Sequence, residues 1–309
     1  MLKSRLCIAF FAFAVGCAPA QKPLTDYVNP MLGTATLWDS VDLGFKPTKR
    51  TWGAEVFPGS SLPNAMVQVS PVTKFHSGAG YQYEDSVIYG FTHTNKGHWN
   101  LCHIPLLPVT GTPTPGDYCS PFSHERESAA PGYYQVFLDR YGVDAQLSST
   151  LRCAFHKYTY PAGAAASLLA DLQRSNEHVR AWDIRKEGDN VFAGWQQTGE
   201  KMYFYAVANR PVTGIEPVVE GDREVRIVRF GEGDGALELR IGFSFVSEKN
   251  ARENLEAEML GKSFAEVRSE ATATWNDLLG RIRVEGGTER EKGLFYSSLY
   301  RSFLWPALR

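Results

Sequence analysis

The sequence has little charge imbalance and no long apolar run after its N-terminus, and each shortage excludes a class of protein. Its 32 Lys and Arg residues against 34 Asp and Glu residues give a net charge of −2 over 309 residues. No basic surface is therefore predicted to collect the phosphates of a nucleic acid, and we expect no nucleic-acid partner. No later stretch approaches the ~18 apolar residues of a membrane-spanning helix. Neither a Gly-x-Ser-x-Gly elbow nor a Ser/His/Asp triad is recognisable.

Cysteine is also scarce, with five in the chain, and Cys7 and Cys17 fall in the N-terminal segment. The other three, Cys102, Cys119 and Cys153, are odd in number, which excludes full pairing. One disulfide, Cys102–Cys119, suits an oxidising compartment; three free thiols are the alternative. None has the Cys-x-x-Cys or Cys/His spacing of a zinc site, so no metal site is expected from the cysteines.

The first 20 residues predict a secretion signal. The cations Lys3 and Arg5 precede an apolar run that is too short to span a bilayer. Two cleavage sites fit: a lipobox that ends in Gly16-Cys17, with Cys17 lipidated, and an ordinary site at Ala18-Pro19-Ala20. We expect an exported protein, either periplasmic or an outer-membrane or cell-surface lipoprotein, that contacts the membrane only through a lipid anchor.

Residues 24–246 predict a β-sandwich domain. Short apolar or alternating runs follow one another there, with turn residues between them and no amphipathic helix. This pattern favours a large antiparallel β-sandwich over an array of β-α-β units. The clearest runs span 65–69, 106–110, 133–138, 167–170, 191–195, 203–207 and 237–243, and the Gly-rich stretch 231–235 reads as a hairpin turn.

Residues 247–286 predict a helical linker with a short strand at 281–285. Good helix formers fill 250–261, and Ser263 with Glu266 forms a capping box. Apolar residues then recur at helical spacing: Phe264, Val267, Ala271, Trp275 and Leu278.

A second capping box, Thr288 with Glu291, opens a final helix in the segment 287–309. Leu294, Phe295, Ser298, Leu299 and Phe303 lie near one face of that helix. A lone amphipathic helix needs a partner for its apolar face. Either it folds back on the sandwich, or the sequence is cut from a longer protein, and we favour the second.

Several stretches together resemble the N-terminal region of glycoside hydrolase family 92, a group of α-mannosidases. The likeness covers nearly all of the chain after its export segment. It is carried by residues 27–34 (YVNPMLGT), 57–71 (FPGSSLPNAMVQVSP), 80–94 (GYQYEDSVIYGFTHT), 275–279 (WNDLL) and 295–301 (FYSSLYR).

The resemblance implies an N-terminal β-sandwich, a helical linker and a C-terminal (α/α)6 barrel. It also implies a calcium-dependent, inverting enzyme that acts on exo-linked α-mannosides of glycans. The family's catalytic acid and base and most of its Ca²⁺ ligands lie in the barrel. We therefore expect no catalytic and no metal-binding residue here, expect them downstream of Arg309, and expect the missing barrel as a partner domain.

Residues 93–103 are the densest functional-looking stretch, and the equivalent loop in the family reaches into the barrel's pocket. We predict that Trp99 stacks on sugar, with His98 and Asn100 donating to its hydroxyls, and we include His93 and Cys102 among the candidate substrate-binding residues. Lys96 and His98 stand where the family has a Ser-Gly-rich run, which leaves the linkage cleaved open. The alternative is an ordinary loop with Trp99 in the core.

Trp52 lies in an early loop-like region and is a further candidate for the same cleft, the alternative being a solvated surface loop. Three functions compete. The chain is the carbohydrate-binding N-terminal part of an α-mannosidase that recognises mannose-containing glycans, a stand-alone carbohydrate-binding module, or a purely structural sandwich.

Overall fold

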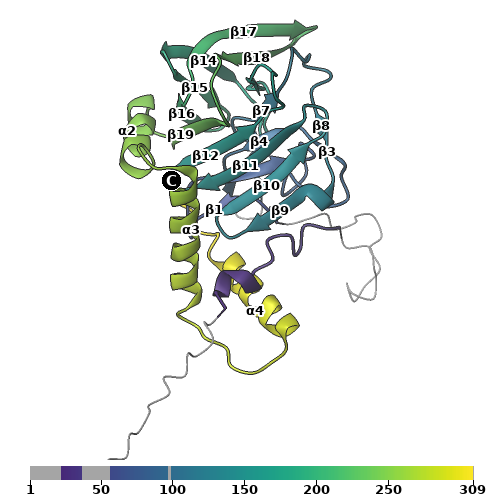
Figure 1. Ribbon diagram of the computed structural model, residues 1–309, viewed down its shortest axis with the longest axis vertical. Coiled ribbons are helices and arrows are strands. Elements are labelled where there is room, and N and C mark those ends of the chain that lie inside the picture. The colour runs from purple at the N-terminus through teal and green to yellow at the C-terminus, as the bar shows by residue number, and fades with distance from the viewer. Residues whose placement is uncertain (1–21, 37–55, 97–98, 309) are drawn as a thin grey trace, which may run out of the picture.

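Two antiparallel β-sheets face each other in the computed structural model, which describes residues 22–36, 56–96 and 99–308 (Figure 1). Within these residues one sheet has seven strands in the spatial order β1-β2-β4-β7-β13-β18-β17. They are β1 (Ser60–Ser61), β2 (Gln68–Val72), β4 (Gly90–Thr92), β7 (Leu106–Val109), β13 (Ser167–Ala170), β17 (Val212–Glu220) and β18 (Arg223–Phe230).

The other sheet has eight strands in the described residues, in the order β14-β15-β16-β19-β12-β11-β10-β9. They are β9 (Glu127–Ala130), β10 (Tyr133–Leu138), β11 (Val143–Ser149), β12 (Cys153–Thr159), β14 (Ala181–Gly188), β15 (Val191–Gln197), β16 (Lys201–Ala208) and β19 (Leu237–Ser244). Two small pairs complete the strands: β3 (Val87–Ile88) with β8 (Ser120–Pro121), and β5 (Asn95–Lys96) with β6 (Trp99–Asn100). The predicted large antiparallel sandwich is confirmed.

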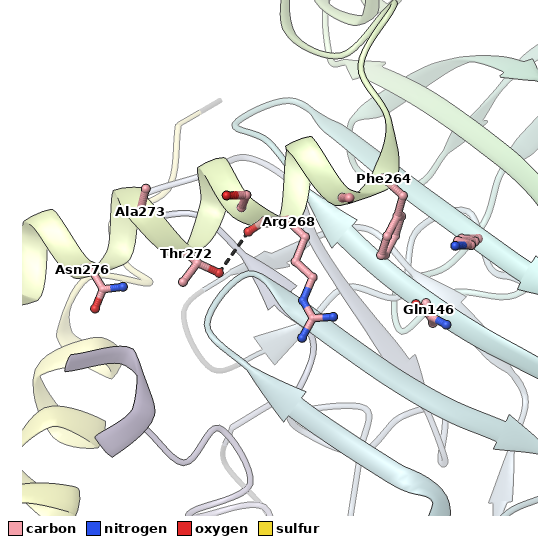
Figure 2. A pocket seen from close by; sticks show the side chains of 9 residues that line it. Gln146, Phe264, Arg268, Thr272, Ala273 and Asn276 are labelled. Atoms are coloured by element: carbon pink, nitrogen blue, oxygen red, sulfur yellow. Dashed lines mark hydrogen bonds between the residues drawn. The ribbon is translucent and has the colours of Figure 1, made fainter. Parts of the chain in front are cut away.

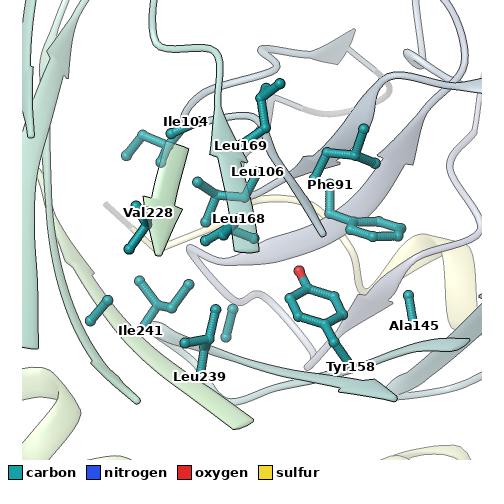
Figure 3. Packing of buried hydrophobic residues seen from close by; sticks show 14 of the residues in the cluster. Phe91, Ile104, Leu106, Ala145, Tyr158, Leu168, Leu169, Val228, Leu239 and Ile241 are labelled. Carbon is teal, nitrogen blue, oxygen red and sulfur yellow. The ribbon is translucent and has the colours of Figure 1, made fainter. Parts of the chain in front are cut away.

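The core lies between the two sheets because the strands alternate apolar and polar residues. Along β16, Met202, Phe204 and Ala206 are buried while Lys201 and Tyr203 lie on the other face. Figure 3 shows residues from both sheets meeting in this layer, each large side chain contributing roughly 1.5–3 kcal/mol by leaving water. The labelled members are Phe91, Ile104, Leu106, Ala145, Tyr158, Leu168, Leu169, Val228, Leu239 and Ile241.

Three of the sequence predictions are wrong in detail. The run at 65–69 forms a strand that starts later, at Gln68. The stretch 231–235 is no hairpin turn, because β18 and β19 on either side of it belong to different sheets. Residues 281–285 form no strand: they are exposed and lack a neighbouring strand, and the Tyr296 hydroxyl contacts their backbone instead, at Ile282 O and Val284 N.

Helix α2 (Glu248–Glu258) covers the outer face of the eight-stranded sheet beside β16 and β19. Ser247 caps it by accepting a hydrogen bond from the Asn250 N–H. The approach is close enough to require glycine below the helix, since a Cβ on Gly242 would lie 2.1 Å from the Ala251 carbonyl oxygen.

Helices α3 (Phe264–Leu279) and α4 (Glu289–Ser302) begin at the two predicted capping boxes, which both form. The face predicted for α3 is confirmed, with Phe264, Val267, Ala271 and Trp275 buried. Together with the short turn η1 (Leu24–Tyr27), α3 and α4 form a second apolar cluster below the sandwich (Figure 1). The members of that cluster are Leu24, Val28, Phe57, Trp275, Leu279, Tyr296, Tyr300 and Leu304.

The apolar face predicted for α4 is only partly correct. Leu299 and Phe303 pack against the second cluster, but Leu294, Phe295 and Ser298 are exposed. The helix instead buries its tyrosine-bearing side, Tyr296 and Tyr300. None of the helices in the described part of the chain is long and apolar enough to cross a membrane.

Candidate functional site

The predicted sugar-binding stretch forms a small β-hairpin between β4 and β7. Its strands β5 and β6 pair Asn95 with Asn100 and Lys96 with Trp99. His98 lies outside the described residues, as do Trp52 and the lipidation candidate Cys17, so these three predictions stay untested. The hairpin is tied to the preceding loop, because the Asn100 N–H donates to the Gly78 carbonyl at 2.9 Å.

Trp99 is a surface residue of this hairpin, with 51% of its area exposed. It is therefore no core tryptophan, and the part of the alternative interpretation that placed Trp99 in the core is wrong. An exposed flat ring can stack on the apolar face of a pyranose. Its contact with sugar stays a prediction.

Asn100 lies next to Trp99 but points into the protein. Its side chain is buried and shares two hydrogen bonds with the Thr92 hydroxyl, at 3.2 and 3.3 Å. Gly80 packs against Asn100 so closely that a Cβ on residue 80 would lie 2.6 Å from Asn100 Nδ2. In this structure Asn100 holds the hairpin, and its predicted donation to a sugar hydroxyl stays a prediction.

Cys102 is buried and sits on strained backbone. Its φ is +52°, in the left-handed region, and its N–H donates to Asn100 Oδ1 at 2.7 Å. Burial raises the pKa of the Cys102 thiol, so the side chain stays uncharged. The described cysteines, Cys102, Cys119 and Cys153, are all free thiols, which selects the second of the two alternatives left open by the sequence.

His93 lies in the core just beyond β4. Its Nε2 is 3.0 Å from His156 Nε2, and His156 Nδ1 is 2.5 Å from the Tyr158 hydroxyl. Burial lowers the pKa of His93 to about 3 and that of His156 well below its usual value. Both rings are therefore neutral at neutral pH. His93 acts here as a buried hydrogen-bonding residue, and its contact with substrate stays a prediction.

The chain on either side of the hairpin is held by polar contacts that the sequence did not reveal. His103 Nδ1 is 2.8 Å from the Thr94 hydroxyl, and its Nε2 is 3.0 Å from the Thr198 hydroxyl. The Asn176 amide donates to the Asn100 carbonyl at 2.6 Å. No sequence motif could reveal these contacts, because Asn176 and Thr198 lie in loops between later strands, far along the chain from the hairpin.

Asn95 is another residue that the sequence did not single out, and its side chain differs from those just described in its hydrogen bonding. Only 3% of its area is exposed, yet neither its amide oxygen nor its amide nitrogen has a hydrogen-bond partner within the described residues. An unsatisfied buried polar group costs about 1–3 kcal/mol. Asn95 is paired in register with the buried Asn100, so its amide faces the protein and not the exposed side of the hairpin that carries Trp99.

A groove of about 590 Å³ lies elsewhere, between α3 and the strands β11 and β12 (Figure 2). It contains none of the predicted site residues, and it is shallow and open along the helix. Its lining residues are Gln146, Lys157, Phe264, Ala265, Arg268, Ser269, Thr272, Ala273 and Asn276. Because chemistry and not size defines a site, we keep the hairpin as the candidate.

The described residues do not form a metal centre. Among residues 22–36, 56–96 and 99–308, no group of three or more His, Cys, Asp or Glu side chains could hold an ion. The Ca²⁺ dependence stays a prediction. The hairpin offers an exposed aromatic ring, which suits stacking on a neutral sugar.

Comparison with known families identifies both parts of the chain. Residues 27–254 match the glycosyl hydrolase family 92 N-terminal domain. Residues 250–309 match the glycosyl hydrolase family 92 catalytic domain.

Individual relatives agree with these matches. The chain is 24% identical to a protein of Arthroderma benhamiae described as an uncharacterized secreted glycosidase, over 91% of this chain and 41% of the relative. A family GH92 α-mannosidase of Bacteroides thetaiotaomicron superposes with a TM-score of 0.81 at 25% identity, over 93% of this chain and 42% of that one. A GH92 inverting mannosidase of the same organism gives 0.78 at 25% identity, over 92% and 40%. The chain thus spans about two fifths of the length of these relatives.

Proposed function

Because this chain belongs to glycosyl hydrolase family 92, we propose that it forms the N-terminal, carbohydrate-binding part of an exo-acting, inverting α-mannosidase. Its substrates would be the α-mannosidic linkages of mannose-containing glycans. The names of the structural relatives, an α-mannosidase and an inverting mannosidase, support the reaction and its substrate class.

One observation carries the binding role: the hairpin presents the Trp99 ring at the surface, where the register of β5 and β6 pairs Trp99 with Lys96. A ring that stacks on a pyranose excludes water from one face of the sugar. This stacking would orient a mannosyl unit without taking part in bond cleavage.

Inverting hydrolysis needs a protonated carboxyl group at the leaving oxygen and a carboxylate that activates water, roughly 6.5–9.5 Å apart. We assign neither role to a described residue. We assign the acid and the base to the family's catalytic domain, which this chain matches only from residue 250 onward. When bound there, Ca²⁺ would supply a positive charge for sugar hydroxyls, and the sandwich would supply one wall of the pocket.

We further propose that the protein is exported by its N-terminal segment, with Cys17 as a lipid anchor if the lipobox before it is cleaved and no anchor if cleavage follows Ala20. The description of the Arthroderma benhamiae relative as secreted supports export. Labelling of cells with radioactive palmitate would test the anchor. If Cys17 is lipidated, the unmodified protein should take up the label and the Cys17→Ala variant should not.

The test of the main proposal is α-mannosidase activity and mannoside binding, measured with added calcium. We would compare two proteins, this 309-residue chain and the product of the complete gene, each with and without the Trp99→Ala substitution. We expect turnover only from the complete product, and about 5- to 10-fold weaker binding of α-mannobiose without the ring, from ~1–1.4 kcal/mol of stacking. Trp305→Ala, which removes another exposed tryptophan, is the matched control.

Turnover by the 309-residue chain would show that the catalytic carboxylates lie within it. Binding that is unchanged by Trp99→Ala would remove the hairpin from the site. Binding without turnover in every form would favour the carbohydrate-binding module over the enzyme.

A further inference from the structure

His124 lies between an exposed aromatic ring and a buried carboxylate, and it is not part of the hairpin. It belongs to the short turn η2 (His124–Arg126), just before β9. Its imidazole is stacked on the Tyr83 ring, with centroids 3.8 Å apart and planes within 4° of parallel. Its Nδ1 is 2.5 Å from Glu127 Oε2, and the Glu127 side chain is only 1% exposed.

The hydrogen-bond partners fix the number of protons on this pair. His124 Nε2 is 2.6 Å from the Tyr83 carbonyl oxygen, which can only accept, so Nε2 carries a proton. On the other side, Nδ1 faces the Glu127 carboxyl group, and two lone pairs cannot meet at 2.5 Å. A second proton therefore lies between Nδ1 and Oε2, and the pair as a whole carries no net charge.

The remaining partners of Glu127 agree with this count. The hydroxyl of Tyr81 lies 2.9 and 3.0 Å from the two carboxyl oxygens, and that of Tyr134 lies 2.5 Å from Oε1. Burial, followed by the nearby Glu127 charge, raises the pKa of both tyrosines, so both hydroxyls keep their protons and donate. Glu127 thus accepts from two hydroxyls and shares the proton of His124.

This buried network holds Tyr83 flat at the surface. Tyr83 remains 41% exposed while one face of its ring lies on His124. Its N–H donates to the Thr34 carbonyl at 3.0 Å, and the next residue, Glu84, accepts from the Thr36 N–H at 2.7 Å. A ring that is already immobilised loses little conformational entropy when a ligand stacks on it.

Tyr83 and Trp99 are connected by one loop. Residues 73–86 run from the end of β2 to β3, and their middle part contacts the hairpin through the Gly78–Asn100 hydrogen bond and the Gly80–Asn100 packing. The end of the loop is fixed to its start by the Thr73 hydroxyl, which donates to Asp85 Oδ2 at 2.7 Å. One braced loop therefore carries Tyr83 and supports the hairpin of Trp99.

We propose that Tyr83 is a second sugar-stacking residue, and that the proton shared by His124 and Glu127 is what holds its ring in place. The ligand class is a neutral pyranoside, a further unit of the glycan whose first unit contacts Trp99, so the inference rests on the proposed function. His124 and Glu127 are positioning residues, since neither touches the sugar.

The test is titration of the 309-residue chain with α-mannobiose and with a longer α-mannan oligosaccharide. Tyr83→Ala should weaken binding of the longer ligand about 5- to 10-fold, by loss of ~1–1.4 kcal/mol of stacking. Tyr83→Phe should bind like the unmodified protein. His124→Gln should fall between them, because the ring stays but loses its support. Phe295→Ala, another exposed ring, is the control.

A second measurement does not depend on any variant folding. Nitrogen-15 NMR of the imidazole should show a proton held at Nε2 of His124 together with a strongly deshielded proton shared with Glu127. An unprotonated Nδ1 would overturn the positioning role. Binding that is lost in Trp99→Ala but unchanged in Tyr83→Ala would overturn this inference and leave the proposed function standing. No binding by the unmodified protein would overturn both.

Discussion

The Nε2 atoms of His93 and His156 lie 3.0 Å apart in the core, so one ring must donate to the other and the two cannot both be charged. The His93 ring is also packed on Phe243, with centroids 4.6 Å apart. Both rings are fully enclosed, and burial lowers both pKa values. The pair joins β4 of one sheet to β12 of the other through a polar contact that depends on neutrality.

Acid should therefore destabilise this domain earlier than carboxylate titration alone would. The unfolded chain takes up a proton at each histidine below pH ~6.5, whereas folded His93 does so only near pH 3. The contribution of neutral His93 to the free energy of unfolding is thus fully present above pH ~6.5. It falls by up to ~1.4 kcal/mol per pH unit below that pH. Urea unfolding at pH 7.5 and pH 5 measures the loss. His93→Gln should lessen the pH dependence by about one proton, and an unaltered dependence would contradict the assignment.

Gly242→Ala should destabilise the protein by about 1–3 kcal/mol, as overpacking does. The new Cβ would lie 2.1 Å from the Ala251 carbonyl oxygen, so α2 would have to lift from the sheet. Gly214→Ala is the matched control, since no atom lies within 4 Å of a Cβ there. Chemical denaturation gives both values. Equal stability of the two variants would show that α2 is not held against β19 as described.

Asn95→Ala should separate stability from binding. Removing an amide that has no partner among the described residues relieves a desolvation cost, so stability should stay level or rise by about 1 kcal/mol. Mannoside binding should stay unchanged, because the buried amide does not face the side of the hairpin that carries Trp99. Thermal unfolding and titration of the same samples check both. Asn100→Ala is the contrasting variant: it breaks the bonds to Thr92 and Cys102 and should lower stability.

The three described thiols should react in a fixed order. Cys119 is only partly buried, whereas Cys102 and Cys153 are enclosed and burial raises the pKa of both. Because the thiolate is the reactive form, iodoacetamide should modify Cys119 first and the other two only on unfolding. Peptide mass mapping after timed labelling gives the order. Early labelling of Cys102 would mean that the hairpin opens readily.

Trp275→Phe should weaken the second apolar cluster by about 1–3 kcal/mol. The indole Nε1 donates to the Ser61 carbonyl at 2.8 Å, and phenylalanine would leave that buried acceptor unpaired. Urea unfolding measures the change. Phe295→Leu, on the exposed side of α4, should leave stability within about 0.5 kcal/mol as a control for this region.

Local patterns in the sequence predicted the elements that depend on local interactions. The alternation of Leu237, Leu239 and Ile241 gave β19, and the capping boxes at Ser263 and Thr288 gave the starts of α3 and α4. The strand predicted at 281–285 failed because alternation says nothing about whether a partner strand lies alongside. The partner of α4 was likewise decided by distant residues, namely η1 and Trp275.

The sequence by itself determined the β-rich class, the two capped helices and the family, because periodicity, caps and motifs are written in neighbouring residues. Only the tertiary structure decided that Asn100 and Cys102 face inward, that Asn95 is buried without a partner, and that His124 supports Tyr83. Each of these depends on contacts between segments far apart in the chain, such as His93 with His156 and Asn100 with Asn176. The free energy of such contacts comes from burial and hydrogen-bond pairing in space, which no local pattern encodes.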